Sequence, residues 1–207
     1  MALLKKTNKI KIKKNEHHFT LDEAKSTRAF WMFALILAFN SFFITGFTFH
    51  VVSIFSSQGY PKSEAISIFL PISIIAISVG TLFNILSDYV RQKLLLYLML
   101  FSGLLASAGL LMLSNKIGIY FLIIGLGCLG GLFSVVNAVT WPRYYGRKHL
   151  GSITGKTMSF LVIASAIAPS LFSYCYTNLG SYTYIGYLNI IFLAVLIIAS
   201  IKAKNPQ

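Results

Sequence analysis

Charged residues are scarce in this sequence. They make up 11% of its 207 residues, and Asp and Glu together number only five. Hydrophobic residues make up 56%, and the mean hydropathy is +0.73. Apolar residues this numerous and this contiguous exceed what a soluble core of this size holds, so the composition excludes a soluble domain. It indicates an integral membrane protein.

Cysteine is also rare, with Cys128 and Cys175 as the two examples. Both fall within apolar runs, where free thiols pack as small hydrophobic groups, so no disulfide is expected. Neither has a neighbour that could ligate a metal, and the pair His17 and His18 has no further ligands at useful spacing. We therefore predict no metal site and no cofactor, with the two histidines in an exposed polar loop.

The charge that is present is mostly positive, since 18 Lys and Arg give a formal net charge of +13. A nucleic-acid binder would need a soluble surface for such a basic footprint, and most of this chain is expected to lie in lipid. The lipid bilayer is the predicted partner, and nucleic acid is not. The positive charge is better interpreted as a signal of topology.

Six apolar runs are long enough to cross a hydrocarbon core of about 30 Å at about 1.5 Å per residue. They lie at 29–56, 64–87, 94–113, 118–140, 157–178 and 182–201. The expected fold is all-α, a six-helix transmembrane bundle over residues 29–201. Very short connections at 57–63, 114–117 and 178–181 predict that consecutive helices pack together as antiparallel hairpins.

Residues 1–28 are predicted to form a basic cytoplasmic N-terminal arm, and residues 202–207 a short cytoplasmic tail. Lysines continue through the first 15 residues without the apolar region and cleavage site of a secretory signal, so this part is expected to be solvated near anionic headgroups. Thr20-Leu-Asp-Glu23 has the spacing of a capping box. It predicts a short helix along the cytoplasmic surface that leads into the first span.

Lys and Arg decide the expected orientation. Eight fall in the arm up to Arg28, two at 91–93, four at 143–156 and two at 202–204, all at one side of the predicted bundle. The other side has only Lys62 and Lys116. Because positive residues accumulate in the cytoplasm, we predict a multi-pass protein of the cell membrane with both termini cytoplasmic.

The most informative stretch is the turn at 141–155, between the fourth and fifth spans. It holds aromatic residues whose apolar bodies and polar tips suit the headgroup layer, namely Trp141, Tyr144 and Tyr145. It also holds, or closely precedes, bases that suit the cytoplasmic side, namely Arg143, Arg147, Lys148 and Lys156. The turn is therefore expected to lie at the cytoplasmic membrane face.

Part of this turn, Arg143-Tyr-Tyr-Gly-Arg-Lys-His-Leu-Gly-Ser-Ile-Thr-Gly155, resembles a loop of major facilitator superfamily transporters. The loop joins the fourth and fifth spans of their C-terminal half, in the branch of monocarboxylate and oxalate/formate carriers. Phe30-Trp31 and Thr45-Gly-Phe-Thr-Phe-His50 resemble the entry and middle of the seventh span in that branch. The resemblance runs from about Phe19 onward.

The resemblance implies one half of a twelve-span secondary carrier, which holds a small solute between two halves and exposes it alternately. Monocarboxylates are the implied class. An oxalate-like dianion is disfavoured as the substrate. Oxalate/formate carriers have basic residues within the equivalents of the second and fifth spans, and this chain has only Lys156, at the cytoplasmic edge of the fifth span. The missing half is expected to be absent through truncation, supplied by a separate chain, or replaced by a second copy.

Other classes fit the sequence less well than a carrier. One alternative is a non-transporting six-helix fragment or scaffold that needs a partner half. An intramembrane serine protease needs Gly-x-Ser-Gly, and Ser102-Gly103 lacks the leading glycine, so no enzyme is expected. A cation channel needs a re-entrant segment before its last span, for which the connection at 178–181 is too short.

Asp88-Tyr-Val-Arg-Gln-Lys93 resembles, in degraded form, the signature loop that the superfamily repeats between the second and third spans of each half. Asn84 stands where the family has glycine. A carboxylate at a membrane face near arginines can hold one conformation closed, and its partial burial would strengthen such a contact. The predicted cytoplasmic gate comprises Asp88, Arg91, Lys93, Arg143, Arg147 and Lys148. The alternative is a solvated turn.

Polar groups inside spans are costly unless they face other helices or a water-filled cavity, so they mark the predicted substrate pathway. In the first span, four residues recur at helical spacing on one stripe, with Thr45 and Thr48 beside it. The predicted pathway comprises Asn40, Phe43, Phe47, Thr48 and His50, with Ser165 and Ser173 around a kink expected at Pro169. For His50, an interhelical hydrogen bond is an equal alternative.

Overall fold

The computed structural model describes residues 17–203, 205 and 206, so most of the predicted basic arm lies outside the described residues. The helices are α1 Leu21–Ser26, α2 Arg28–Ser56, α3 Lys62–Ser67, α4 Phe69–Leu86, α5 Gln92–Leu111, α6 Lys116–Tyr145, α7 Leu150–Leu179 and α8 Thr183–Ile201. Within the described residues no strand occurs, and six helical segments are long and apolar enough to cross a membrane. The predicted all-α polytopic fold is confirmed.

The chain enters the first span through two consecutive helix caps. The Thr20 backbone N–H donates to the Glu23 carboxylate (2.7 Å), and the Thr20 hydroxyl accepts from the Glu23 backbone N–H (3.3 Å). This is the predicted capping box, and these hydrogen bonds lower the pKa of Glu23 because they favour its ionised form. His17 and His18 lie exposed in the irregular segment before α1, as predicted. α2 then starts at a second cap, where Thr27 accepts from Phe30.

The second span consists of two helices, α3 and α4, that meet at Ile68. Pro71 accounts for the interruption, because it has no N–H to donate to the carbonyl of Ser67, four residues earlier. In the first turn of α4 the proline is tolerated, because the backbone N–H groups of a helix's first turn have no acceptor within that helix. The predicted run at 64–87 is therefore one span whose hydrogen bonding is interrupted at Ile68, where the backbone stays helical (φ −66°, ψ −22°).

The turn between α6 and α7 is much shorter than predicted. α6 continues to Tyr145, where Gly146 ends it with a φ of 75°, and α7 begins at Leu150. A positive φ favours glycine, which explains why the helix stops there. Most of the predicted turn at 141–155 is thus helical.

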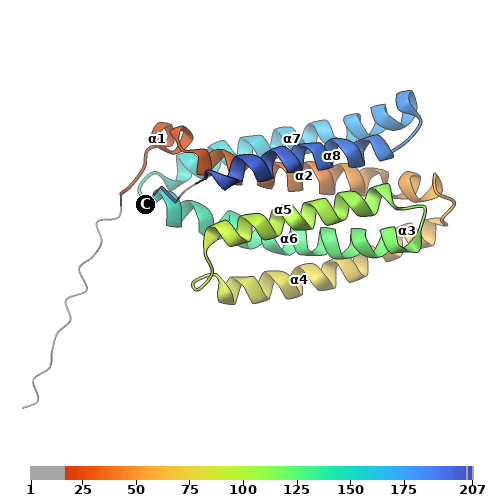
Figure 1. Ribbon diagram of the computed structural model, residues 1–207, viewed down its shortest axis with the longest axis horizontal. Coiled ribbons are helices and arrows are strands. Elements are labelled where there is room, and N and C mark those ends of the chain that lie inside the picture. Colours follow the sequence, from red (N-terminus) through yellow and green to blue (C-terminus); the bar gives the residue numbers. More distant parts are fainter. Residues whose placement is uncertain (1–16, 204, 207) are drawn as a thin grey trace, which may run out of the picture.

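The helices pack in an order that differs from their order in the chain (Figure 1). The most extensive contacts join α5 with α6, α2 with α7, α4 with α6, and α5 with α8. Contacts of α2 with α6 complete a row in the order α4, α6, α2, α7, and α5 and α8 lie against one side of that row. The hairpin prediction is right for α5 and α6. It is wrong for α7 and α8, which touch lightly, and the first and second spans meet through α3 and not through α4.

Small residues determine which helices touch, because they let backbones approach closely. A Cβ on Gly125 of α6 would lie 2.4 Å from the backbone nitrogen of Ala106 in α5. A Cβ on Gly131, further along α6, would lie 2.6 Å from the carbonyl oxygen of Ala76 in α4. Short loops constrain direction only, whereas these contacts select the neighbour.

Burial is very unequal among the spans. In their most apolar windows, 61% of residues are buried in α2 and 56% in α5 and α6. The corresponding values are 17% in the α3–α4 span and 22% in α7. The helices at the two ends of the row therefore contact the rest of the bundle along a narrow strip and leave most of their surface outward.

Candidate functional site

One end of the bundle gathers the basic turns, and we refer to it as the basic end. The α4–α5 turn, the α6–α7 turn and the end of α8 all lie there, together with α1 (Figure 1). Arg143, in the last turn of α6, donates hydrogen bonds to the Asp88 carboxylate and to the Ser87 carbonyl. Asp88 and Arg143, two of the predicted gate residues, therefore meet, and their contact links the ends of α4 and α6.

The exposure of this ion pair corrects one expectation. The Asp88 side chain is 82% exposed and that of Arg143 is 31% exposed. Partial burial of the pair was expected. It holds for Arg143 and is wrong for Asp88, because α4 contacts α6 on one side only and leaves Asp88 facing outward. Exposed pairs of this kind contribute about 0–1 kcal/mol.

The other predicted gate residues do not gather around Asp88. The Lys93 ammonium donates to the Ile201 carbonyl (2.9 Å), so it neutralises the C-terminal end of α8 instead. Arg91 is the N-cap residue of α5 and is exposed. Arg147 and Lys148 lie exposed in the α6–α7 turn. Of the six predicted gate residues, the structure joins Asp88 and Arg143.

The aromatic residues of the basic end lie inside the protein. Trp141 and Tyr145 are fully buried and Tyr144 is 7% exposed, so their predicted placement in the headgroup layer is wrong. Trp141 and Tyr144 pack against Phe30 and Phe33 of α2. The segment around α1 covers Tyr145, since Phe19 donates its N–H to the Tyr145 carbonyl (3.0 Å) and Thr27 shares a hydrogen bond with the Tyr145 hydroxyl (2.7 Å). Phe19, an aromatic residue in that segment, is the feature of the sequence from which this packing could have been predicted.

Most of the predicted pathway stripe on α2 is core. Phe43 and Phe47 are fully buried and pack against each other with ring centroids 6.3 Å apart, and Asn40 is 7% exposed. The face of α2 that stays accessible lies on the other side of the helix and carries Ser41, Thr45 and Thr48, which are half-buried or exposed. The predicted stripe therefore marks the buried side of α2, because large aromatic rings gain most from burial.

His50 links three elements. Its Nε2 lies 3.0 Å from the Pro169 carbonyl of α7, and its Nδ1 lies 3.3 Å from the hydroxyl of Tyr182, just before α8. The Tyr182 hydroxyl also donates to Ser53 (2.9 Å). The interhelical hydrogen bond that was one alternative for His50 is present. α7 continues through Pro169 without a break, with Ser165 half-buried and Ser173 exposed beside it.

A polar hollow of about 350 Å³ lies between α4 and α6. Thr81 and Asn84 of α4 line it together with Ser134 of α6, and Gly80 lets the two helices approach there. Thr81, Asn84 and Ser134 are exposed. This hollow was missed, although Asn84 and Thr81 are polar residues one turn apart in an apolar helix and could have revealed it.

Neither protein-family models nor curated proteins match this chain.

Among the described residues, no group of three His, Cys, Asp or Glu side chains could hold a metal ion. Along α2, α4, α6 and α7 the accessible polar groups include uncharged hydroxyls and amides, and the Asp88–Arg143 ion pair lies at the basic end. Chemically, this arrangement can hydrogen-bond a polar solute or a facing helix.

Proposed function

We propose that this chain is one six-helix half of a secondary carrier of small solutes, of the major facilitator type, and that it works with a second six-helix bundle. The observation that carries the proposal is the open side of the row α4, α6, α2, α7. α5 and α8 cover the other side, and the two outer helices of the row, α4 and α7, both carry exposed polar groups.

α4 contributes a polar stripe. Ser73, Thr81 and Asn84 recur at helical spacing on α4, Asp88 continues the stripe in the turn that follows, and all four are exposed. Ser73 satisfies its hydroxyl on its own helix, by donating to the Phe69 carbonyl (2.8 Å), but Asn84 holds its amide outward. An exposed amide and carboxylate on a helix of this kind are costly in lipid and favourable against protein or water.

α7 contributes a face of small residues. Those that are exposed at helical spacing are Gly151, Gly155, Ser159, Ala166, Ser170, Ser173 and Thr177. A Cβ on Gly151 or Gly155 would meet no atom within 4 Å. Faces of this composition let two helices approach closely in a membrane, so α7 suits contact with a second bundle.

The exposed Asp88–Arg143 pair fits the same proposal. A second bundle over the open side would cover Asp88 and lower the local dielectric, which strengthens the attraction between the two charges. The pair would then hold the basic end closed in one conformation and release it in the other. Monocarboxylates are proposed as the solute class from the resemblance, with the hydroxyls of α2 and the amide of Asn84 as hydrogen-bonding groups.

The orientation is part of the proposal, with the basic end in the cytoplasm of a cell membrane. In a chain with Cys128 and Cys175 replaced, single cysteines at Gly59, Asn115 and Gly180 should react with an impermeant maleimide added to intact cells. Cysteines at Tyr89 and Ser152, both exposed at the basic end, should react only after lysis. Reaction at Ser152 in intact cells would reverse the orientation.

Transport is tested on the complex as it forms in the cell. A cysteine at Ala166 on the small face should be cross-linked by a bifunctional maleimide to the second bundle, whether that is another chain or a second copy. A cysteine at Val195, exposed on α8 at the covered side of the row, should not. The purified partner is identified by its mass.

Proteoliposomes containing that complex should take up labelled lactate or pyruvate in a saturable manner, and those with the chain alone should match empty liposomes if the partner is a different chain. Asn84→Leu should reduce uptake at least about tenfold, and Ile198→Leu on α8 should not. Uptake by the complex no greater than by empty liposomes would reject the carrier in favour of a non-transporting scaffold. Transport that is unaffected by Asn84→Leu would place the pathway elsewhere.

A further inference from the structure

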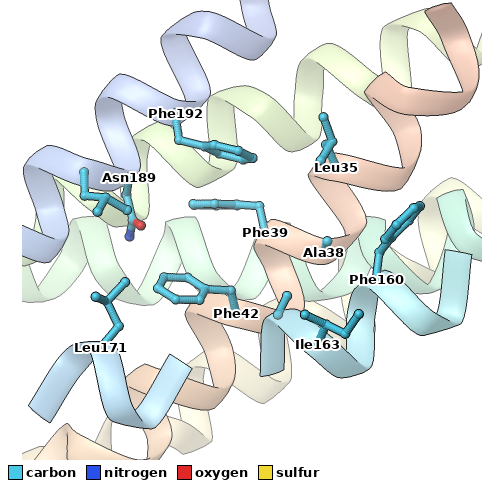
Figure 2. A pocket seen from close by; sticks show the side chains of 11 residues that line it. Leu35, Ala38, Phe39, Phe42, Phe160, Ile163, Leu171, Asn189 and Phe192 are labelled. Carbon is cyan, nitrogen blue, oxygen red and sulfur yellow. The ribbon is translucent and has the colours of Figure 1, made fainter. Parts of the chain in front are cut away.

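A groove of about 310 Å³ lies between α2, α7 and α8, on a different face of α2 from Ser41, Thr45 and Thr48 (Figure 2). It exists because α7 packs mainly on α2 and α8 mainly on α5, so α7 and α8 touch each other only lightly. Its volume is near the lower end of those that hold small ligands. The groove therefore belongs to the covered side of the bundle and not to the proposed carrier pathway.

The lining of the groove is apolar with a single exception. Phe39 and Phe42 of α2, and Phe160 and Ala164 of α7, form much of its surface, and Asn189 of α8 is its only polar residue. Figure 2 shows the Asn189 amide at one end of the groove, with Phe160 toward the other end. A charged ligand is excluded, because no lining residue could compensate its charge.

Asn189 is the anomaly that points to a ligand. Its side chain is fully buried, yet neither its amide oxygen nor its amide nitrogen has a hydrogen-bond partner in the described residues. A buried amide without partners is destabilising, and asparagine is otherwise unfavourable in an apolar helix such as α8. A molecule seated in the groove would supply the missing partners.

The amide dictates the chemistry of that molecule. Asn189 offers both a donor and an acceptor, so the best complement is one group that also does both, such as a hydroxyl or an un-ionised carboxyl. Water would satisfy the amide but not the apolar remainder of the groove, which favours a hydrocarbon chain. Ile163 and Leu188 at its mouth are exposed on membrane-spanning helices, so a molecule dissolved in the bilayer could enter directly.

We propose that the groove between α2, α7 and α8 binds a neutral single-chain amphiphile from the membrane, with its hydroxyl or un-ionised carboxyl on Asn189. The chain lies along α7 toward Phe160. Two natural sources share this chemistry, long-chain alcohols and protonated fatty acids. The site is independent of transport, so the experiment below measures binding alone.

Trp31 provides a reporter at the far end of the groove, because its ring centroid lies 5.7 Å from that of Phe160. Trp31 and Trp141 are the two tryptophans of the chain, so Trp141→Phe leaves Trp31 as the sole emitter. In nanodiscs, 12-bromododecan-1-ol should quench Trp31 saturably, because its bromine would sit near Phe160. 1-Bromododecane, which lacks the hydroxyl, should bind at least about tenfold more weakly at equal mole fraction in the bilayer.

Three variants separate the steps of the proposal. Asn189→Leu should remove the preference for the alcohol over the alkane, while leaving binding of the alkane intact as its own check of folding. Ala164→Phe should fill the groove and abolish saturable quenching by both probes. Ala166→Phe, exposed on the same helix but outside the groove, should change neither.

A brominated fatty acid distinguishes long-chain alcohols from protonated fatty acids as the natural ligand. 12-Bromododecanoic acid should quench saturably at a pH where it is protonated and lose this at a pH where it is ionised, whereas the alcohol should be insensitive to pH. Quenching by the acid that persists when it is ionised would contradict a neutral ligand. Equal binding of alcohol and alkane, an alcohol preference that survives Asn189→Leu, or no saturable quenching by any probe would overturn the proposal.

Discussion

Two glycine-bearing faces of this protein look alike in sequence and behave differently in the structure. Gly125 of α6 lies so close to α5 that an added Cβ would be 2.4 Å from a backbone nitrogen. Gly155 of α7 would accept the same Cβ with nothing within 4 Å. The comparison shows that a small residue in a membrane helix marks a contact surface without saying whether the contact is within the chain or with a partner.

The sharpest test of this comparison is the same substitution at both positions. Gly125→Ala should destabilise the bundle by about 1–3 kcal/mol, because the new methyl group must push α5 away. Gly155→Ala should leave the isolated chain unchanged or stabilise it by about 0.5–1 kcal/mol, since alanine is the better helix former. Unfolding in mixed micelles, followed by circular dichroism, measures both. Equal effects would mean that the inner contact is no tighter than the outer face.

Removing the N-cap of α1 tests whether the segment around α1 keeps the basic end closed. Thr20→Ala should cost about 1 kcal/mol locally, the usual value for a lost N-cap, and should make Trp141 more accessible to a water-soluble quencher. Because the pKa of Glu23 is lowered, the cap is at full strength above the ordinary value and weakens as pH falls through the lowered pKa. In the Trp31→Phe background, where Trp141 is the sole emitter, quenching of Trp141 should therefore increase as the pH falls. It should increase less when Thr20→Ala is also present.

Substituting His50 tests the hydrogen-bonded link between α2 and α7, which lies near the end of the bundle opposite the basic end. His50→Phe removes both ring nitrogens but keeps an aromatic ring against Phe172, so it should cost about 0.6 kcal/mol, typical of interhelical hydrogen bonds in membranes. Tyr182→Phe should cost a similar amount, and the double variant less than the sum, because the two share one network. Strict additivity would show that the two side chains are not coupled.

The smallest effect is expected on the open side. Asp88→Asn should change the stability of the isolated chain by less than about 1 kcal/mol, because its partner Arg143 meets it in an exposed site. In the complex with a second bundle, the same change should increase labelling of a cysteine at Asn137 by a reagent added to the basic end. Lys202→Gln serves as the control. If the Asp88→Asn substitution leaves labelling at position 137 unchanged, the Asp88–Arg143 pair is not a latch.

Prediction of the site residues succeeded where a short segment contained the information. Asp88 and Arg143 were placed at the same face because both end a span there, and the chain order alone requires that. Their contact is a result of the structure. Asn40, Phe43 and Phe47 share one face of α2, as helical spacing predicted, but spacing cannot tell an inward face from an outward one. Asn189 was not identified, since an asparagine in an apolar run does not reveal whether its amide finds a partner.

The sequence by itself determined the six spans, the capping box at Thr20 and the gathering of basic residues at one end. These depend on local composition, because about 20 apolar residues are enough to favour a membrane-spanning helix wherever its neighbours are. Only the tertiary structure decided that α4 packs on α6, that α7 packs on α2, and that Tyr145 is covered by the segment around α1. In lipid, hydrophobicity does not select among apolar helices, so close packing at residues such as Gly125 and Gly131 makes that choice.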